Sequence, residues 1–168
     1  VVDMDRHYYE QHNLTLAQHP SETAERLMLR LLVFALHASE SMAFTKGVST
    51  DDEPDLWQKS LSGDIELWIE LGLPSERRLK KACGRSQQVI VYAYGTGAAH
   101  LWWQKIQPQL SRFKNLTVVR IDAAPLEQLA MFLTRTMELQ VSIQDAEITC
   151  RCDDNELSIT PENLLASG

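Results

Sequence analysis

The 168-residue chain has few cysteines, no long apolar run and no excess of basic residues, and each absence argues against a class of protein. Three cysteines without a C-x-x-C pair disfavour a disulfide scaffold and favour a reducing, cytoplasmic setting. No apolar run reaches the length of a membrane span, and the first residues, VVDMDRHYYE, lack the regions of a signal peptide, so we expect no membrane association. A formal net charge of −7 argues against a surface coated for bulk nucleic-acid binding, while a local basic site stays open.

The chain does have enough apolar residues for one real core. Hydrophobic residues make up 44% of the sequence, and the length suits a single domain over residues 1–168. Because Val1 is not an initiator residue, we expect the first strand to be incomplete. The order of patterns is helix, hairpin, helix, strand, helix, strand, helix and meander. This order predicts an α/β fold with a mixed central sheet flanked by helices and a C-terminal antiparallel meander.

Hydrophobic periodicity locates the expected helices and strands around the hairpin. The clearest helix spans 20–36, with Ser21 as its N-cap and an apolar stripe that includes Met28 and Leu32. The other expected elements are a strand over 13–17, a helix over 74–84, strands over 89–94 and 116–122, a helix from residue 98 that Pro108 breaks or kinks, a helix from Pro125 to Met137, and a meander over 139–159.

The stretch over 55–72 is typical of a β-hairpin. Two strand-like runs, 55–61 and 64–72, meet at a two-residue Ser62-Gly63 turn, where glycine supplies the positive φ that tight hairpins need. One face of the second run is apolar, so a slip in register would expose that row to water. The register predicts these cross-strand pairs on the other face: Trp57 with Trp68, Lys59 with Glu66, and Asp55 with Glu70.

The pairing of Asp55 with Glu70 places two carboxylates directly opposite each other, where like charges are destabilising. A cation between them would remove this repulsion. Hard oxygen ligands suit Mg²⁺ or Mn²⁺, which would polarise a phosphate oxygen and lower the pKa of a bound water. The alternative is that both carboxylates lie on a solvated sheet face.

Two further features contribute charged candidates. Glu25 extends the buried stripe of the first helix by one turn, although it is also suited to complementing the helix dipole or to pairing with an arginine on the same helix. Directly after the hairpin, the segment 77–85 carries five basic residues, for which a solvated helix face is the alternative. These are Arg77, Arg78, Lys80, Lys81 and Arg85.

A glycine turn and a pair of tryptophans have structural explanations that we favour over functional ones. The turn Gly95-Thr96-Gly97 lies between a strand and a helix, where backbone amides can hold phosphate, but it carries only part of a dinucleotide-binding fingerprint. Trp102 and Trp103 are expected to pack rather than to stack on bases.

Several long phrases resemble known proteins. The hairpin, with Asp55 and Glu70 on successive strands, is similar to that of the PD-(D/E)XK nuclease superfamily. The phrases LTLAQHPSETAER (14–26), DDEPDLW (51–57) and LWIELGLPSERRLKKAC (67–83) resemble the YaeQ family of bacterial proteins, and the resemblance runs over most of the chain.

The resemblance implies a restriction-endonuclease-like core with Asp55 and Glu70 at its metal positions and Glu25 as the acidic residue of the first helix. Gly72 stands where the superfamily has its lysine. A lysine from the next helix can substitute, and we choose Lys81, with Lys80 and Arg78 as alternates.

The function implied is a nuclease that uses Mg²⁺ or Mn²⁺ to hydrolyse nucleic-acid phosphodiesters. Its catalytic residues would be Glu25, Asp55, Glu70 and Lys81, and Arg78, Lys80 and Arg85 would bind the nucleic acid. The alternative is a non-catalytic regulatory module that binds nucleic acid or a protein partner and retains a degenerate site.

Overall fold

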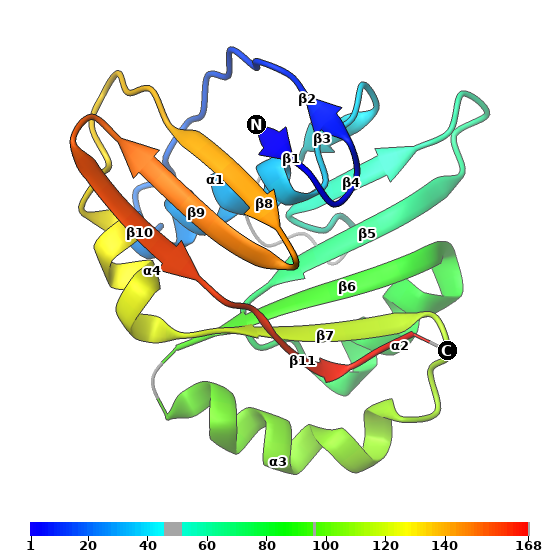
Figure 1. Cartoon of the computed structure of the whole chain (residues 1–168). Helices are drawn as coiled ribbons and strands as arrows, with labels where there is room; N and C mark the ends of the chain where they lie inside the picture. Colours follow the sequence, from blue (N-terminus) through cyan, green and yellow to red (C-terminus); the bar gives the residue numbers. More distant parts are fainter. Residues whose placement is uncertain (46–51, 96, 168) are drawn as a thin grey trace. The chain divides into compact units, whose positions relative to one another are not determined.

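The computed structural model describes residues 1–45, 52–95 and 97–167, in which two mixed sheets and four helices form a mixed α/β fold (Figure 1). The chain divides into two compact units. Unit 1 consists of Val1–Ala38 and Asp122–Pro161, and unit 2 consists of Ser39–Ile121 and Glu162–Gly168. The single-domain expectation stays a prediction. No helix in the described ranges is long and apolar enough to cross a membrane.

Unit 1 is built on a five-stranded sheet that combines two strands from residues 2–9 with three strands from residues 140–159. The predicted meander is confirmed as three antiparallel strands, and β1 adds to it in parallel, with Val2 opposite Ser142. The strand predicted over 13–17 is wrong, because the structure has no strand at these residues. The early strands are β1 and β2, which come before residue 13. In spatial order the strands are β10 (Asn155–Ile159), β9 (Glu147–Cys152), β8 (Gln140–Gln144), β1 (Val2–Asp3) and β2 (Tyr8–Tyr9).

The helices of unit 1 are α1 (Ala24–Leu36) and α4 (Ala123–Ala130). The predicted stripe of α1 is confirmed, since Met28 and Leu32 are fully buried. Its N-cap is Thr23 rather than Ser21, because the Thr23 hydroxyl accepts a hydrogen bond from the Arg26 amide at 3.2 Å. α4 is shorter than its apolar period suggested and ends at Ala130, so the expected extension to Met137 is wrong.

Unit 2 is built on a six-stranded sheet whose three central strands run parallel. The expected single sheet is therefore replaced by two, because the C-terminal meander pairs with β1 and not with these strands. A strand that the sequence did not reveal, β11, pairs with β7 at one edge (Figure 1). In spatial order the strands are β11 (Glu162–Leu165), β7 (Leu116–Ile121), β6 (Ser86–Tyr94), β5 (Ile65–Leu71), β4 (Leu56–Lys59) and β3 (Met42–Phe44).

Two helices of unit 2, α2 (Glu76–Arg85) and α3 (Ala98–Leu110), share one apolar core with the sheet. Leu79 of α2 and Leu110 of α3 are fully buried beside Trp68 and Val91 of the strands. Pro108 does not end α3, which continues to Leu110. Trp102 and Trp103 pack against this core, as expected.

The predicted hairpin forms, with one correction near its turn. Trp57 pairs with Trp68 as expected, but a β-bulge after Gln58 places Lys59 opposite Ile65 instead of Glu66. The turn is longer than two residues, because the amide of Ser60 donates to the carbonyl oxygen of Asp64 at 2.8 Å and closes a loop over 61–63. The register beyond Trp57 is unaffected, so the far end of the hairpin keeps its predicted alignment.

Candidate carboxylate site

Four charged residues are buried as whole residues in the described part of the chain: Asp3, Arg30, Asp55 and Glu70. The two in unit 2 are both acids, and both belong to the hairpin. Asp55 is 6% exposed and Glu70 is 4% exposed. The alternative that Asp55 and Glu70 lie on a solvated sheet face is therefore wrong. Burying two like charges is costly unless other groups compensate them.

Backbone pairing fixes Asp55 at the end of β4. The ladder aligns Leu56 with Ile69, and the amide of Asp55 donates to the carbonyl oxygen of Ile69 at 3.0 Å. The side chain then folds across to β5, where its Oδ2 accepts a hydrogen bond from the amide of Leu71 at 2.8 Å. This acceptor role is available to the ionised carboxylate, and it holds Asp55 beside Glu70.

Glu70 is held through one of its two oxygens. Its Oε1 accepts hydrogen bonds from the indole Nε1 of Trp68 and from Nε of Arg78, each at 2.8 Å. Burial raises the pKa of the Glu70 carboxyl above its ordinary value, opposed by the charge of Arg78 and by the indole hydrogen bond, and the charge of Asp55 raises it further. Glu70 is thus a carboxyl whose ionisation depends on a nearby cation.

The contacting cation is Arg78 of α2. The helix begins at the N-cap Ser75, whose hydroxyl accepts the amide of Arg78 at 3.2 Å and so fixes the first turn. From there the guanidinium reaches Glu70, and its Nη2 donates to the carbonyl oxygen of Glu53 at 2.8 Å. Arg78 is therefore anchored at both ends of its guanidinium, with 24% of its side chain exposed.

The other basic residues of α2 point elsewhere. Nζ of Lys81 donates to Oδ1 of Asp52 at 2.9 Å, on the exposed surface. Arg85 donates to the carbonyl oxygen of Asp52 at 3.1 Å and lies over the ring of Trp68. Lys80 is exposed. From the sequence, Lys81, Lys80 and Arg78 are the candidates for the missing lysine. Of these three, Arg78 contacts a carboxylate of the pair.

Glu25 belongs to the other unit. It lies in the first turn of α1 and is half-buried, while the arginines of this helix pair with a different acid. Arg30 Nη2 binds Glu22 Oε1 at 2.8 Å, and Arg26 lies 3.9 Å from the same carboxylate. The role expected for Glu25 at the pair stays a prediction.

Gly72, which stands where the nuclease signature that the hairpin resembles has a lysine, has a backbone conformation that favours glycine. Its φ of 110° lies in the left-handed region, where any residue with a side chain is strained. Its amide donates to the carbonyl oxygen of Tyr92 at 3.0 Å, and the chain then turns toward α2. The position is a backbone turn, so a cation for the site must come from another element.

The two buried carboxylates suit a divalent metal that needs few protein ligands. No group of three or more His, Cys, Asp or Glu side chains in the described ranges is arranged to hold one. Mg²⁺ and Mn²⁺ often bind only one or two protein carboxylates and keep several waters, and a buried aspartate–glutamate pair meets that requirement. Asp55 and Glu70 therefore fit as the protein ligands of such an ion.

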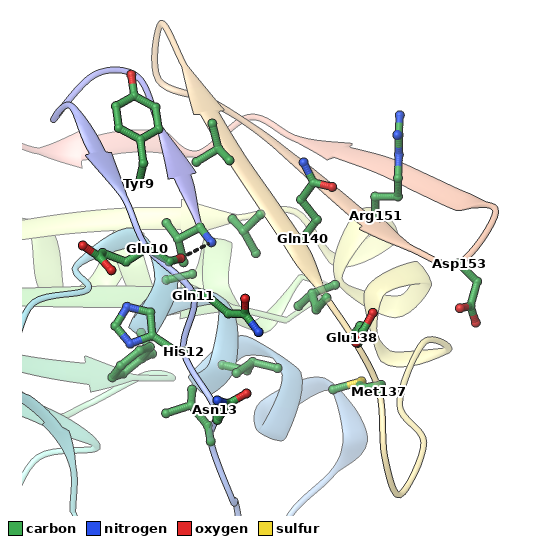
Figure 2. Close-up of a pocket in the computed structure, with 18 residues that line it drawn as sticks. Tyr9, Glu10, Gln11, His12, Asn13, Met137, Glu138, Gln140, Arg151 and Asp153 are labelled. Carbon is green, nitrogen blue, oxygen red and sulfur yellow. Dashed lines mark hydrogen bonds between the residues drawn. The ribbon is translucent and has the colours of Figure 1, made fainter.

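A pocket of about 810 Å³ in unit 1 is a weaker candidate. Its labelled polar side chains do not converge on one point (Figure 2). His12 is bound to the hydroxyl of Tyr8 at 2.8 Å, and Arg151 is paired with Glu156 outside the pocket lining. The glycine turn considered from the sequence includes Thr96, which lies outside the described residues.

Comparisons with known proteins agree with one another. A family model described as YaeQ protein matches residues 1–161. The chain is 48% identical over 159 residues to a protein of Salmonella typhi, covering 95% of this chain and 88% of the relative, and 46% identical over 166 residues to one of Escherichia coli K12, covering 99% and 90%. Both relatives are named "Uncharacterized protein YaeQ".

Two crystal structures are similar throughout. The YaeQ protein of Xanthomonas axonopodis pv. citri superposes with a TM-score of 0.94 at 48% identity, covering 98% of this chain and 93% of the other. That of Pseudomonas syringae has a TM-score of 0.93 at 34% identity, covering 98% and 91%.

Proposed function

The chain belongs to the YaeQ family, and we propose that it is a nuclease-like protein that hydrolyses nucleic-acid phosphodiesters with Mg²⁺ or Mn²⁺ at Asp55 and Glu70. The observation that supports this is the burial of two adjacent carboxylates beside one arginine in unit 2. In this proposal the core is restriction-endonuclease-like, as the resemblance of the hairpin implies.

Each side chain has a defined task in the proposed reaction. Asp55 and Glu70 hold the metal, which supplies an activated water and a Lewis acid for the phosphate. Arg78 is placed to stabilise the negative charge of the phosphate, because its guanidinium lies at the carboxylates and is partly exposed. Lys81 keeps the task proposed for it, which is to orient the water or to stabilise charge.

A second candidate is a non-catalytic module, and a specific observation favours it. Arg78 already compensates the charge of Glu70, and Lys81 is bound to Asp52 instead of the pair. In this candidate the carboxylates only stabilise the hairpin. Arg78, Lys80 and Arg85 would then contact the phosphates of a nucleic acid or the acidic surface of a protein partner.

Metal-dependent cleavage assays distinguish the two candidates. Chelator-treated protein is incubated with single- and double-stranded DNA and RNA, with and without Mn²⁺ or Mg²⁺. We expect Asp55→Asn and Glu70→Gln to reduce cleavage by about 100-fold or more, because each removes a charged metal ligand while keeping the size of the side chain. Glu66→Gln, a half-buried acid on the same strand, is the matched control and should cleave like the wild type.

Binding without cleavage in every metal would support the non-catalytic module. Cleavage that is equal in wild type, Asp55→Asn and Glu70→Gln would refute the proposed site.

A further inference from the structure

Arg78 is held more firmly than a surface arginine. Its backbone amide is bound by the N-cap Ser75, its Nε donates to Glu70, and its Nη2 donates to the Glu53 carbonyl oxygen. A guanidinium with fixed acceptors at two of its nitrogens is preorganised in one position. In the described structure that position is against the carboxylate that would bind a metal.

The hydrogen bonds at Glu70 leave little room for a metal on the same oxygen. A carboxylate oxygen has two lone pairs, and Oε1 already accepts from both Trp68 and Arg78. A cation that binds Glu70 through Oε1 must therefore replace one of these donors. The indole belongs to a fully buried side chain, whereas Arg78 is partly exposed, so the arginine is the donor that can leave.

The charges lead to the same result. The ionised pair carries two negative charges, and Arg78 contributes one positive charge. A divalent ion alone balances the pair, while a divalent ion beside the guanidinium leaves one positive charge in excess. Like charges a few ångströms apart in a largely buried site repel strongly.

From these contacts we infer that Arg78 is an internal counter-ion that competes with the divalent cation for the Asp55–Glu70 pair. The inference rests on the proposed metal site. Arg78 contacts Glu70 when no metal is bound, and metal binding displaces the guanidinium from Glu70 toward the phosphate of the substrate. Arg78 thus couples metal binding to substrate binding.

The test is the Mn²⁺ affinity of chelator-treated protein, measured by isothermal titration calorimetry without nucleic acid. Arg78→Gln removes the positive charge and keeps a hydrogen-bond donor of moderate length. We expect it to bind Mn²⁺ about tenfold more tightly than wild type, because the attraction of the pair for a dication is no longer opposed. Arg77→Gln is the matched control, since Arg77 precedes it on the same helix, is exposed, and undergoes the same change of charge. It should stay within about twofold of wild type.

A charge-conserving pair of variants covers the case in which Arg78→Gln does not fold. In Arg78→Lys the shorter side chain cannot contact both Glu70 and the Glu53 carbonyl oxygen, so the counter-ion is held less firmly. We expect Mn²⁺ binding about threefold tighter than in Arg77→Lys. Adding Glu70→Gln to either Arg78 variant should abolish the gain, which locates the effect at the pair.

The outcomes separate this inference from the proposed function. If wild type binds Mn²⁺ and neither Arg78 variant gains affinity over its Arg77 control, the competition is refuted and the metal site stands. Mn²⁺ binding by neither wild type nor the Arg78 variants refutes both. A gain in affinity without cleavage of any substrate supports the competition and refutes the nuclease.

Discussion

Each unit of the molecule contains a buried carboxylate held by an arginine, but the balance of charge differs between them. In unit 1, Asp3 is bound by Arg6 at 2.6 Å and Glu22 by Arg30 at 2.8 Å. The side chains of Glu22 and Arg30 are each 5% exposed, and Arg26 lies 3.9 Å from the same carboxylate, so this acid has at least one arginine for its single charge. In unit 2, Glu70 is bound by Arg78, and a second buried acid lies beside it.

This difference indicates which buried charges are structural. A carboxylate with its own guanidinium is satisfied and has no reason to bind a further ion. Two buried acids beside one arginine keep an excess of negative charge, which only a proton or a cation removes. The same residue types therefore form structural ion pairs in unit 1 and, in our proposal, a metal-binding site in unit 2.

The largest expected effect comes from removing the arginine of each unit. Arg30→Gln removes the arginine that binds the buried Glu22 at 2.8 Å and leaves only the more distant Arg26, so it should reduce the free energy of unfolding by about 3–5 kcal/mol. Arg78→Gln should cost less, about 2–3 kcal/mol, because Arg78 is partly exposed. Urea unfolding with chelator and with Mn²⁺ checks both. At one Mn²⁺ concentration, about 100 times the dissociation constant of Arg78→Gln, Mn²⁺ should restore about 2.7 kcal/mol to Arg78→Gln but only about 1.4 kcal/mol to Arg30→Gln, whose intact Arg78 weakens Mn²⁺ binding about tenfold. An equal response of the two variants to Mn²⁺ would contradict the distinction between a structural ion pair in unit 1 and a metal-binding site in unit 2.

An intermediate effect is expected from pH, with opposite signs in the two units. Burial lowers the pKa of His37 in unit 1 to about 4, helped by the charge of Arg6. The unfolded state then binds the proton more readily, so this unit loses stability as the pH falls from about 6.5 to about 4. The loss is about 2 kcal/mol, after allowing for the contact of a half-buried ring with water.

Glu70 shows the reverse dependence. The pKa of the Glu70 carboxyl is raised, so the folded state holds the proton more tightly than the unfolded state. The stability that this proton contributes is lost as the pH rises from 4.5, the ordinary pKa of the carboxyl, through the raised pKa. Urea unfolding from pH 4 to 8 should show that His37→Gln flattens the acid side of the profile. Glu70→Gln should remove the loss of stability above pH 4.5. Parallel profiles for the two variants would contradict both assignments.

The smallest expected effect is at the helix N-caps, where the units should behave alike. Thr23→Ala in α1 and Ser75→Ala in α2 each remove one hydroxyl that accepts a backbone amide at 3.2 Å. Each should cost about 1 kcal/mol in thermal or urea unfolding. Ser21→Ala is the control, because Ser21 lies before the cap and is bound to His19 on the surface, and it should change stability by less than about 0.5 kcal/mol. A larger cost for Ser21→Ala would mean that α1 begins earlier.

The sequence predicted the parts of the fold that depend on alternation and periodicity. The pairing of Trp57 with Trp68 follows from the apolar row of β5, because a one-residue slip would expose that row. The bulge at Lys59 could not be seen, since it depends on how Ser60 closes the turn. The end of α4 was missed because apolar residues keep a helical period past Ala130, where the backbone leaves the helix.

The sequence predicted the two acids of the candidate site but not the residues that surround them. Alternation along the hairpin brings Asp55 to Glu70, but it does not show that α2 and α3 cover this side of the sheet together with Trp68. Arg78 and Lys81 are both basic residues of α2, and the structure shows that Arg78 donates to Glu70 while Lys81 donates to Asp52. The sequence could not rank them, because the choice depends on how α2 packs against the sheet.

The division of the chain has a consequence for how the protein is made. Unit 1 uses residues from before and after the first segment of unit 2, and β11 returns to unit 2 after unit 1 is finished. During synthesis, β1 therefore waits for β8, which is about 140 residues further along the chain. The edge of β7 is covered only when β11 emerges. The sheet of unit 1 needs residues up to Ile159 and the sheet of unit 2 needs residues up to Leu165, so we expect both sheets to be completed late and nearly together during folding.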